Sequence, residues 1–153
     1  MLSETTKTSW QINSSINMNL LEHLNSDMLS AQTPGGSMSA AQHLIHMVDA
    51  VRFWGCYFDE PRFSALPDLA GASEESVNLD KLRFDMKQRD AAALEASLAA
   101  TDKGRLPFDS IGTFLIHIVS HDAHHRGQIV LALKTSAHTL PSDDALWSPW
   151  RGG

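Results

Sequence analysis

Apolar residues recur at helical spacing in four separate stretches of the chain, and no stretch alternates as a half-buried β-strand would. In the first stretch they stand four apart, at Ile12, Ile16, Leu20 and Leu24. Segments rich in glycine and proline, "TPGGS" and "TDKGRLPFDS", interrupt the pattern and indicate helix ends. The chain is therefore expected to be all-α. The predicted helices cover residues 10–29, from Ser37 or Ser39 to about 54, 76–101, and from Asp109 or Ser110 to about Lys134.

The connections between these segments predict how the helices are arranged. Residues 59–76, "DEPRFSALPDLAGASEES", form a long connection that suits a crossover better than a tight hairpin. The tail, from about residue 135 to residue 153, has no helical pattern, but its two tryptophans favour irregular packing against the body. A chain of 153 residues can bury one sizeable core. We therefore expect a single domain over residues 1–153, a four-helix bundle with a long crossover between its second and third helices.

Charge and composition restrict the possible partners. The formal net charge is −6 and the basic residues do not cluster, so the basic face that nucleic-acid binding requires is missing. No apolar run approaches the roughly 18 residues of a membrane span, and the N-terminus lacks the apolar region of a signal peptide. The single cysteine fits a reducing compartment. We expect a cytoplasmic protein that binds neither nucleic acid nor membrane.

Histidines are concentrated in two of the predicted helices. Four of the eight lie in the last predicted helix: His117, His121, His124 and His125. Residues four apart on a helix are separated by about 40° around the axis, so His121 and His125 can bind one metal ion together. The same spacing also allows a pair of His117 and His121. A third ligand has to come from another helix, and the spacing in "AAQHLIHMVDA" leaves both His43 and His46 open.

A site of three neutral imidazoles differs from a structural metal site. It leaves coordination positions for water or substrate, which is the arrangement of a catalytic centre. Imidazole ligands suit zinc, nickel, iron or copper, so the residues do not select one metal. A peptidase of the HExxH type is disfavoured, because Asp122 stands where that motif has its glutamate.

The segment "HDAHHRGQIVLAL" resembles the DinB/YfiT-like superfamily of bacterial metal-binding four-helix proteins. The residues that carry the resemblance are His121, His125, Arg126, Gly127 and Gln128, in the pattern HxxxHRGQ. The resemblance extends to "HLIHMVDAVRFW", where His46 stands eight residues before Trp54, and to the ending "LPSDDALWSPW". It covers nearly the whole chain in order and spacing. It implies that the metal ligands are His46, His121 and His125.

Three further residues are candidates for supporting roles near the ligands. Asp49, nearly one turn after His46, can accept a hydrogen bond from an imidazole N–H or pair with Arg52. Arg126 points roughly 100° away from the ligand beside it. It either forms a salt bridge to another helix or to a partner subunit, or anchors an anionic group of a substrate. Gln128 can orient the backbone or a ligand through its amide. The sequence does not identify catalytic residues.

The resemblance also implies a function. The superfamily includes thiol-dependent S-transferases and a thiol-dependent isomerase that use low-molecular-weight thiols such as bacillithiol or mycothiol. By this resemblance the chain holds one divalent ion, zinc or nickel, and joins such a thiol to a small electrophile. The alternatives are a stress-response protein that binds metal without turnover and a metal-dependent hydrolase. The sequence favours an enzyme without deciding the point. Many members pair through their helices, so a homodimer is expected.

Overall fold

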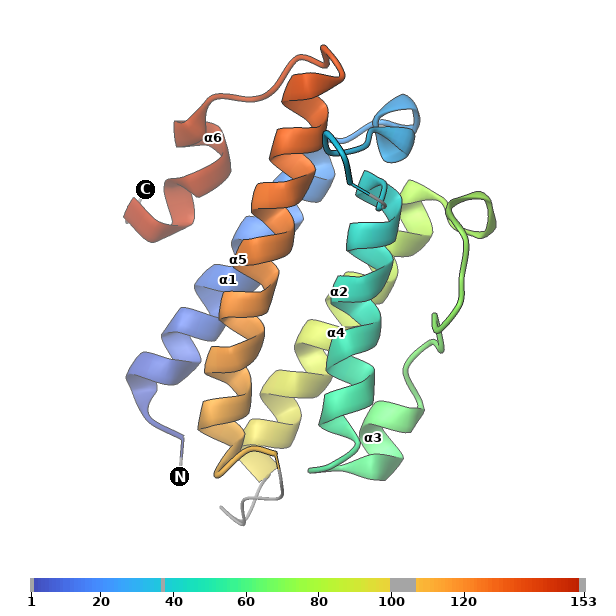
Figure 1. Cartoon of the computed structure of the whole chain (residues 1–153). Coiled ribbons are helices and arrows are strands. Elements are labelled where there is room, and N and C mark those ends of the chain that lie inside the picture. The colour runs from blue at the N-terminus through green and yellow to red at the C-terminus, as the bar shows by residue number, and fades with distance from the viewer. Residues whose placement is uncertain (1, 37, 100–106, 152–153) are drawn as a thin grey trace.

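The computed structural model describes residues 2–36, 38–99 and 107–151. Four long helices make up its body: α1 (Glu4–His23), α2 (Ala40–Gly55), α4 (Leu79–Ala99) and α5 (Ile111–Thr135). Helices α1 and α2 each pack against both α4 and α5, so α2 and α5 are neighbours in a four-helix bundle (Figure 1). The predicted all-helical bundle is confirmed. None of the helices in these three ranges combines the length and hydrophobicity that crossing a bilayer takes.

Helix α1 begins and ends about six residues earlier than predicted. It begins at Glu4 instead of Trp10, because the Ser3 side chain accepts a hydrogen bond from the Thr6 N–H and caps the helix. It ends at His23, whereas the prediction extended it to residue 29. The chain there enters a separate 3₁₀ helix, η1 (Ser26–Ser30), which is capped by the side chain of Asn25.

Helices α2 and α5 begin where a serine cap was predicted. Ser39 and Gln42 form a capping box at α2, in which each side chain accepts a hydrogen bond from the other residue's backbone N–H. The alternative cap, Ser37, lies outside the described residues. Ser110 caps α5, which ends at Thr135, one residue beyond the predicted end. Side-chain caps are local features, which is why the sequence located these two.

The crossover between α2 and α4 is partly helical. It contains α3 (Glu60–Ser64) and a 3₁₀ turn, η2 (Glu74–Ser76), so α4 begins three residues later than predicted. The predicted end of α4 at Thr101 lies outside the described residues. Helix α3 buries Phe63 against the last turn of α2 at Gly55, where a Cβ atom would lie only 2.2 Å from the Phe63 ring. Glycine at this position therefore allows the crossover to pack closely.

The C-terminal tail is more regular than predicted. Ser142 caps a short helix, α6 (Asp143–Trp147), which is followed by the 3₁₀ helix η3 (Ser148–Arg151). Both pack against α1, as Figure 1 shows for α6 beside the bundle. The expected irregular structure is therefore wrong for residues 143–151, because four-residue capping signals can start a short helix without a long apolar pattern. Leu146, which is buried, anchors the tail.

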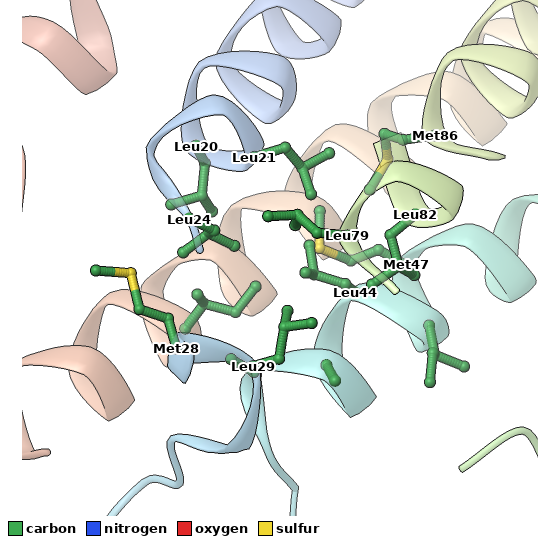
Figure 2. Close-up of a cluster of buried hydrophobic side chains, with 14 of the residues drawn as sticks. Leu20, Leu21, Leu24, Met28, Leu29, Leu44, Met47, Leu79, Leu82 and Met86 are labelled. Carbon is green, nitrogen blue, oxygen red and sulfur yellow. The ribbon is translucent and has the colours of Figure 1, made fainter. Parts of the chain in front are cut away.

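Two apolar clusters fill the bundle, and a layer of buried polar side chains separates them along the helices. One cluster gathers leucines and methionines where α1 ends and where α2 and α4 begin (Figure 2). The other contains aromatic residues, among them Trp10, Phe63 and Phe114. The buried residues between the clusters, called the polar layer below, are Asn13, Asn17, Arg89, Asp90, Asp122 and Arg126. Helices α1, α4 and α5 each supply two of them.

Candidate metal centre

Three imidazoles from two neighbouring helices meet on one side of the bundle. His46 comes from α2, and His121 and His125 come from α5. The Nε2 atom of His121 lies 3.1 Å from Nε2 of His46 and 3.2 Å from Nε2 of His125. The spacing of four residues places the two α5 rings on one face, and the packing of α2 against α5 supplies the third. These are the histidines that the family resemblance implied as ligands.

The ligand atoms of the three residues lie within 4.8 Å of one another, and two of the three nitrogen separations fit a shared divalent ion. Two nitrogens that each lie about 2.1 Å from a shared ion are about 3.0 Å apart at a right angle and about 3.4 Å apart at the tetrahedral angle. The two measured separations, 3.1 and 3.2 Å, fall between these values. Within the described ranges, the ligand atoms that cluster here are the three imidazoles alone, without a carboxylate or a thiol. They would therefore leave part of an ion's coordination sphere open.

The site is open toward solvent on the side of α2. His46 is exposed, the side chain of His121 is 18 % exposed, and His125 is 6 % exposed. An ion held by the three rings would therefore have the protein interior behind it and solvent in front. This difference in exposure allows a small molecule to approach the open side.

Burial favours the neutral form of two of the three imidazoles, those of His125 and His46. Burial lowers the pKa of His125 to about 3, with smaller contributions from the neighbouring His121 and His46. Partial burial of the His46 ring and the neighbouring His121 also lower the pKa of His46, although the carboxylate of Asp49 opposes the shift. A neutral imidazole has the lone pair that a metal requires, so the lowered pKa values of His125 and His46 favour the binding of a cation.

The other histidines of the two helices occupy different places. His43 is buried, and its Nδ1 atom lies 2.8 Å from Nδ1 of His125, on the side of that ring away from His121. His117 is exposed, and its ring centre is 6.1 Å from that of His121. His124 is exposed on α5. Both candidates on α2 contact the pair on α5, but His46 is the one that clusters with His121 and His125 as a possible metal ligand.

Asp122 lies at the centre of the polar layer, directly behind the site. Its Oδ1 accepts a hydrogen bond from Arg89 Nη1 at 3.1 Å, and its Oδ2 accepts one from Arg89 Nη2 at 2.6 Å. The amides of Asn13 and Asn17 each donate a further hydrogen bond to Oδ2 at 2.8 Å. The carboxylate thereby ties α5 to both α1 and α4. Its Oδ1 is also 4.0 Å from the buried Nδ1 of His121.

This carboxylate stays ionised although it is fully buried. Burial by itself would raise the pKa of Asp122, but the charge of Arg89 and the donated hydrogen bonds hold that pKa well below its usual range. Asp122 is therefore a structural anion inside the bundle. Asp122 stands at the sequence position of the glutamate in HExxH, but its carboxylate is bonded to Arg89 inside the bundle, so it is not placed as the general base of a peptidase.

The three supporting candidates lie in different environments. Asp49 is half-buried one turn from His46, and its enclosed Oδ1 has no hydrogen-bond partner among the described residues. The alternative pairing with Arg52 is not formed, since Arg52 contacts Asp68 at 3.1 Å. Gln128 is half-buried on α5 and takes no part in the polar layer.

Arg126 lies in the interior, away from the open side of the site. It is 3 % exposed and donates hydrogen bonds to the side-chain oxygens of Asn13 and Asn17. Its guanidinium also lies 6.0 Å from the ring centre of Trp147 in the tail. These contacts join α5 to α1, as the salt-bridge interpretation supposed, but the partners are neutral amides.

The sequence interpretation missed most of the polar layer. Its signal was present, because Arg89 and Asp90 stand three and four residues after the core residue Met86, on the same helix face. Asn13 and Asn17 likewise interrupt the buried stripe of α1 between Trp10 and Leu20. Polar residues at core positions on three helices indicate a shared hydrogen-bond network, since burying them singly would be costly.

The fold and the site define a class: a four-helix bundle with an open three-histidine site, which fits the binding of a divalent metal ion. A sequence model of the DinB family matches residues 2–152, and the chain belongs to that family. The match covers nearly the whole chain and confirms the resemblance seen in the HxxxHRGQ pattern. Comparisons with curated proteins and with solved structures found no match.

Proposed function

We propose that the protein is a metal-dependent S-transferase that joins a low-molecular-weight thiol to a small electrophile. The observation that supports this proposal is the convergence of three imidazole Nε2 atoms at a site exposed on one side. A bound zinc or nickel ion would supply positive charge that stabilises a thiolate near neutral pH. The choice of a thiol as co-substrate rests on the family resemblance, as do homodimer formation and a link to stress.

The proposed reaction is a substitution at an electrophilic carbon. The thiol loses its proton to solvent, its sulfur forms a bond to the carbon, and the leaving group departs with the electrons of the broken bond. The chain's own residues hold the reacting centre in place. His125 and His121 form the buried side of the site, His46 forms its exposed edge, and the polar layer behind them keeps α5 in register with α1 and α4.

One observation favours an enzyme over a protein that only stores or senses metal. The histidine cluster includes no fourth protein ligand among the described residues, and Asp49 in particular is not part of it. Sites with three protein ligands and an open position are typical of catalysis, whereas closed sites with four are typical of structure. Metal-assisted hydrolysis has less support, because Asp122, the one candidate base in the motif, is buried against Arg89.

The first test is metal content. Purified protein should contain about one transition metal per chain by elemental analysis. His121→Ala and His125→Ala should lose it, while His23→Ala, an exposed histidine on α1, should retain it. Failure of the wild-type protein to take up zinc or nickel would remove the basis for the proposal.

The second test is turnover. Metal-loaded protein is incubated with bacillithiol, mycothiol or glutathione and a chromogenic aryl halide, and product formation is followed by absorbance. We expect a rate above background that requires metal and one of the thiols and disappears in His121→Ala. Stoichiometric metal without any thiol-dependent rate would instead support the protein that binds metal without turnover.

A further inference from the structure

His43 is a buried histidine that does not reach the metal centre but contacts one of its ligands. It lies three residues before His46 on α2 and is 5 % exposed. Its Nδ1 atom is 2.8 Å from Nδ1 of His125, and the ring centres are 5.1 Å apart. His125 therefore has a partner at each nitrogen: His43 at Nδ1 and His121 at Nε2.

A contact of 2.8 Å between two ring nitrogens requires one proton between them. Two N–H groups facing each other would repel, and two lone pairs facing each other would leave both nitrogens unsatisfied. One of the two rings is therefore the donor and the other the acceptor. Coordinates do not contain the proton, so the rest of the site has to assign it.

The ligand role of His125 decides which of the two rings donates this hydrogen bond. A metal-binding imidazole is neutral and offers a lone pair at the ligating nitrogen, so its single proton has to be on the other nitrogen. In His125 the ligating atom is Nε2, which faces His121 and His46. The proton then belongs on Nδ1, and Nδ1–H donates to the lone pair of His43 Nδ1.

We propose that His43 is a positioning residue for the metal centre: it accepts the hydrogen bond of His125 Nδ1–H and holds that ring in the tautomer that presents Nε2 to the ion. Without an acceptor at this point, the proton of His125 has a better place on Nε2, where it can be donated to His121 Nε2 at 3.2 Å. That tautomer puts a proton where the ion has to bind. Outer partners of this kind typically contribute about 10- to 100-fold to metal affinity.

The inference depends on the metal site but not on the transferase reaction. Zinc affinity is measured by competition with a chromogenic chelator for wild-type protein, His43→Leu and His43→Asn. His43→Leu removes the acceptor, while His43→Asn keeps an oxygen close to the position of Nδ1. His124→Leu is the matched control, since it makes the same substitution beside His125 at an exposed residue outside the cluster.

We expect His43→Leu to weaken zinc binding by about 10- to 100-fold, His43→Asn to restore most of the loss, and His124→Leu to match the wild type. Long-range ¹H–¹⁵N spectra of the metal-free proteins should show His125 protonated at Nδ1 in the wild type and at Nε2 in His43→Leu. A purely structural role would not move this tautomer. Urea unfolding of the metal-free proteins separates any effect of a substitution on the stability of the fold from its effect on zinc affinity.

Zinc affinity of His43→Leu equal to that of His124→Leu would overturn the proposal, as would a proton on Nδ1 of His43 in the zinc-bound protein. If His43→Leu does not fold, His43→Asn and His43→Gln decide the question, because glutamine places its amide beyond the position of Nδ1. Equal affinities of these two variants would then refute the assignment. A wild type that binds no zinc would refute the metal site itself, which is a different result.

Discussion

Replacing Asp122 with asparagine removes one negative charge from the bundle interior and leaves the size of the side chain almost unchanged. The two oxygens of Asp122 accept four hydrogen bonds, two from Arg89 and one each from Asn13 and Asn17. In the variant, one oxygen becomes an NH₂ group that faces these donors. The layer also keeps two guanidinium groups, of Arg89 and Arg126, against the single carboxylate of Asp90.

The expected loss in the free energy of unfolding is large, because both members of the Asp122–Arg89 pair are fully buried. Removing one partner of a buried ion pair typically costs about 3–5 kcal/mol. Since domains of this size have a total stability of about 5–15 kcal/mol, the variant loses a substantial part of it. At about 2–4 °C per kcal/mol, the midpoint of thermal unfolding should fall by about 6–20 °C.

Urea unfolding followed by far-ultraviolet circular dichroism measures this loss, in the presence of a chelator so that metal binding does not contribute. The matched control is Asp144→Asn, whose carboxylate pairs with Arg151 at the surface, where the side chains are 83 % and 58 % exposed. A surface pair contributes about 0–1 kcal/mol, so this variant should unfold like the wild type. If Asp122→Asn also stays within about 1 kcal/mol of the wild type, the buried pair does not have the role assigned to it.

Three further predictions concern other parts of the fold. Gly55→Ala should lower the free energy of unfolding by up to about 2 kcal/mol, because overpacking against Phe63 exceeds the gain in helix propensity. Gly127→Ala, which has open space around it, should instead raise the free energy of unfolding. Equal urea midpoints for the two variants would contradict the close packing at Gly55. Burial raises the pKa of Asp90 to about 6 against the charge of its neighbouring arginine. The folded state therefore holds this proton more tightly than the unfolded state, and stability is lost as pH rises from about 4 to about 6. Asp90→Asn should gain stability relative to the wild type over that range, and a difference independent of pH between 4 and 7 would refute the shift. Ser39→Ala should cost about 1 kcal/mol through loss of the capping box, and an unchanged urea midpoint would show that the cap contributes nothing.

The sequence by itself determined the features that depend on neighbours within about four residues. Helical periodicity predicted the four long helices, and the serine caps located the start of α2 and α5. The spacing of His121 and His125 predicted that they share a face of one helix. The ends of α1 and the short α6 were missed, because a cap and a few favourable residues compete there with a weak apolar pattern.

The tertiary structure decided which distant side chains meet. From spacing alone, His43 and His46 were equivalent, and only the packing of α2 against α5 brings His46 to Nε2 of His121 and His43 to Nδ1 of His125. The polar layer joins residues more than 100 positions apart, such as Asn13 and Asp122. Such contacts depend on the rotation and register of whole helices in the bundle, which local hydrogen bonds and periodicity do not specify.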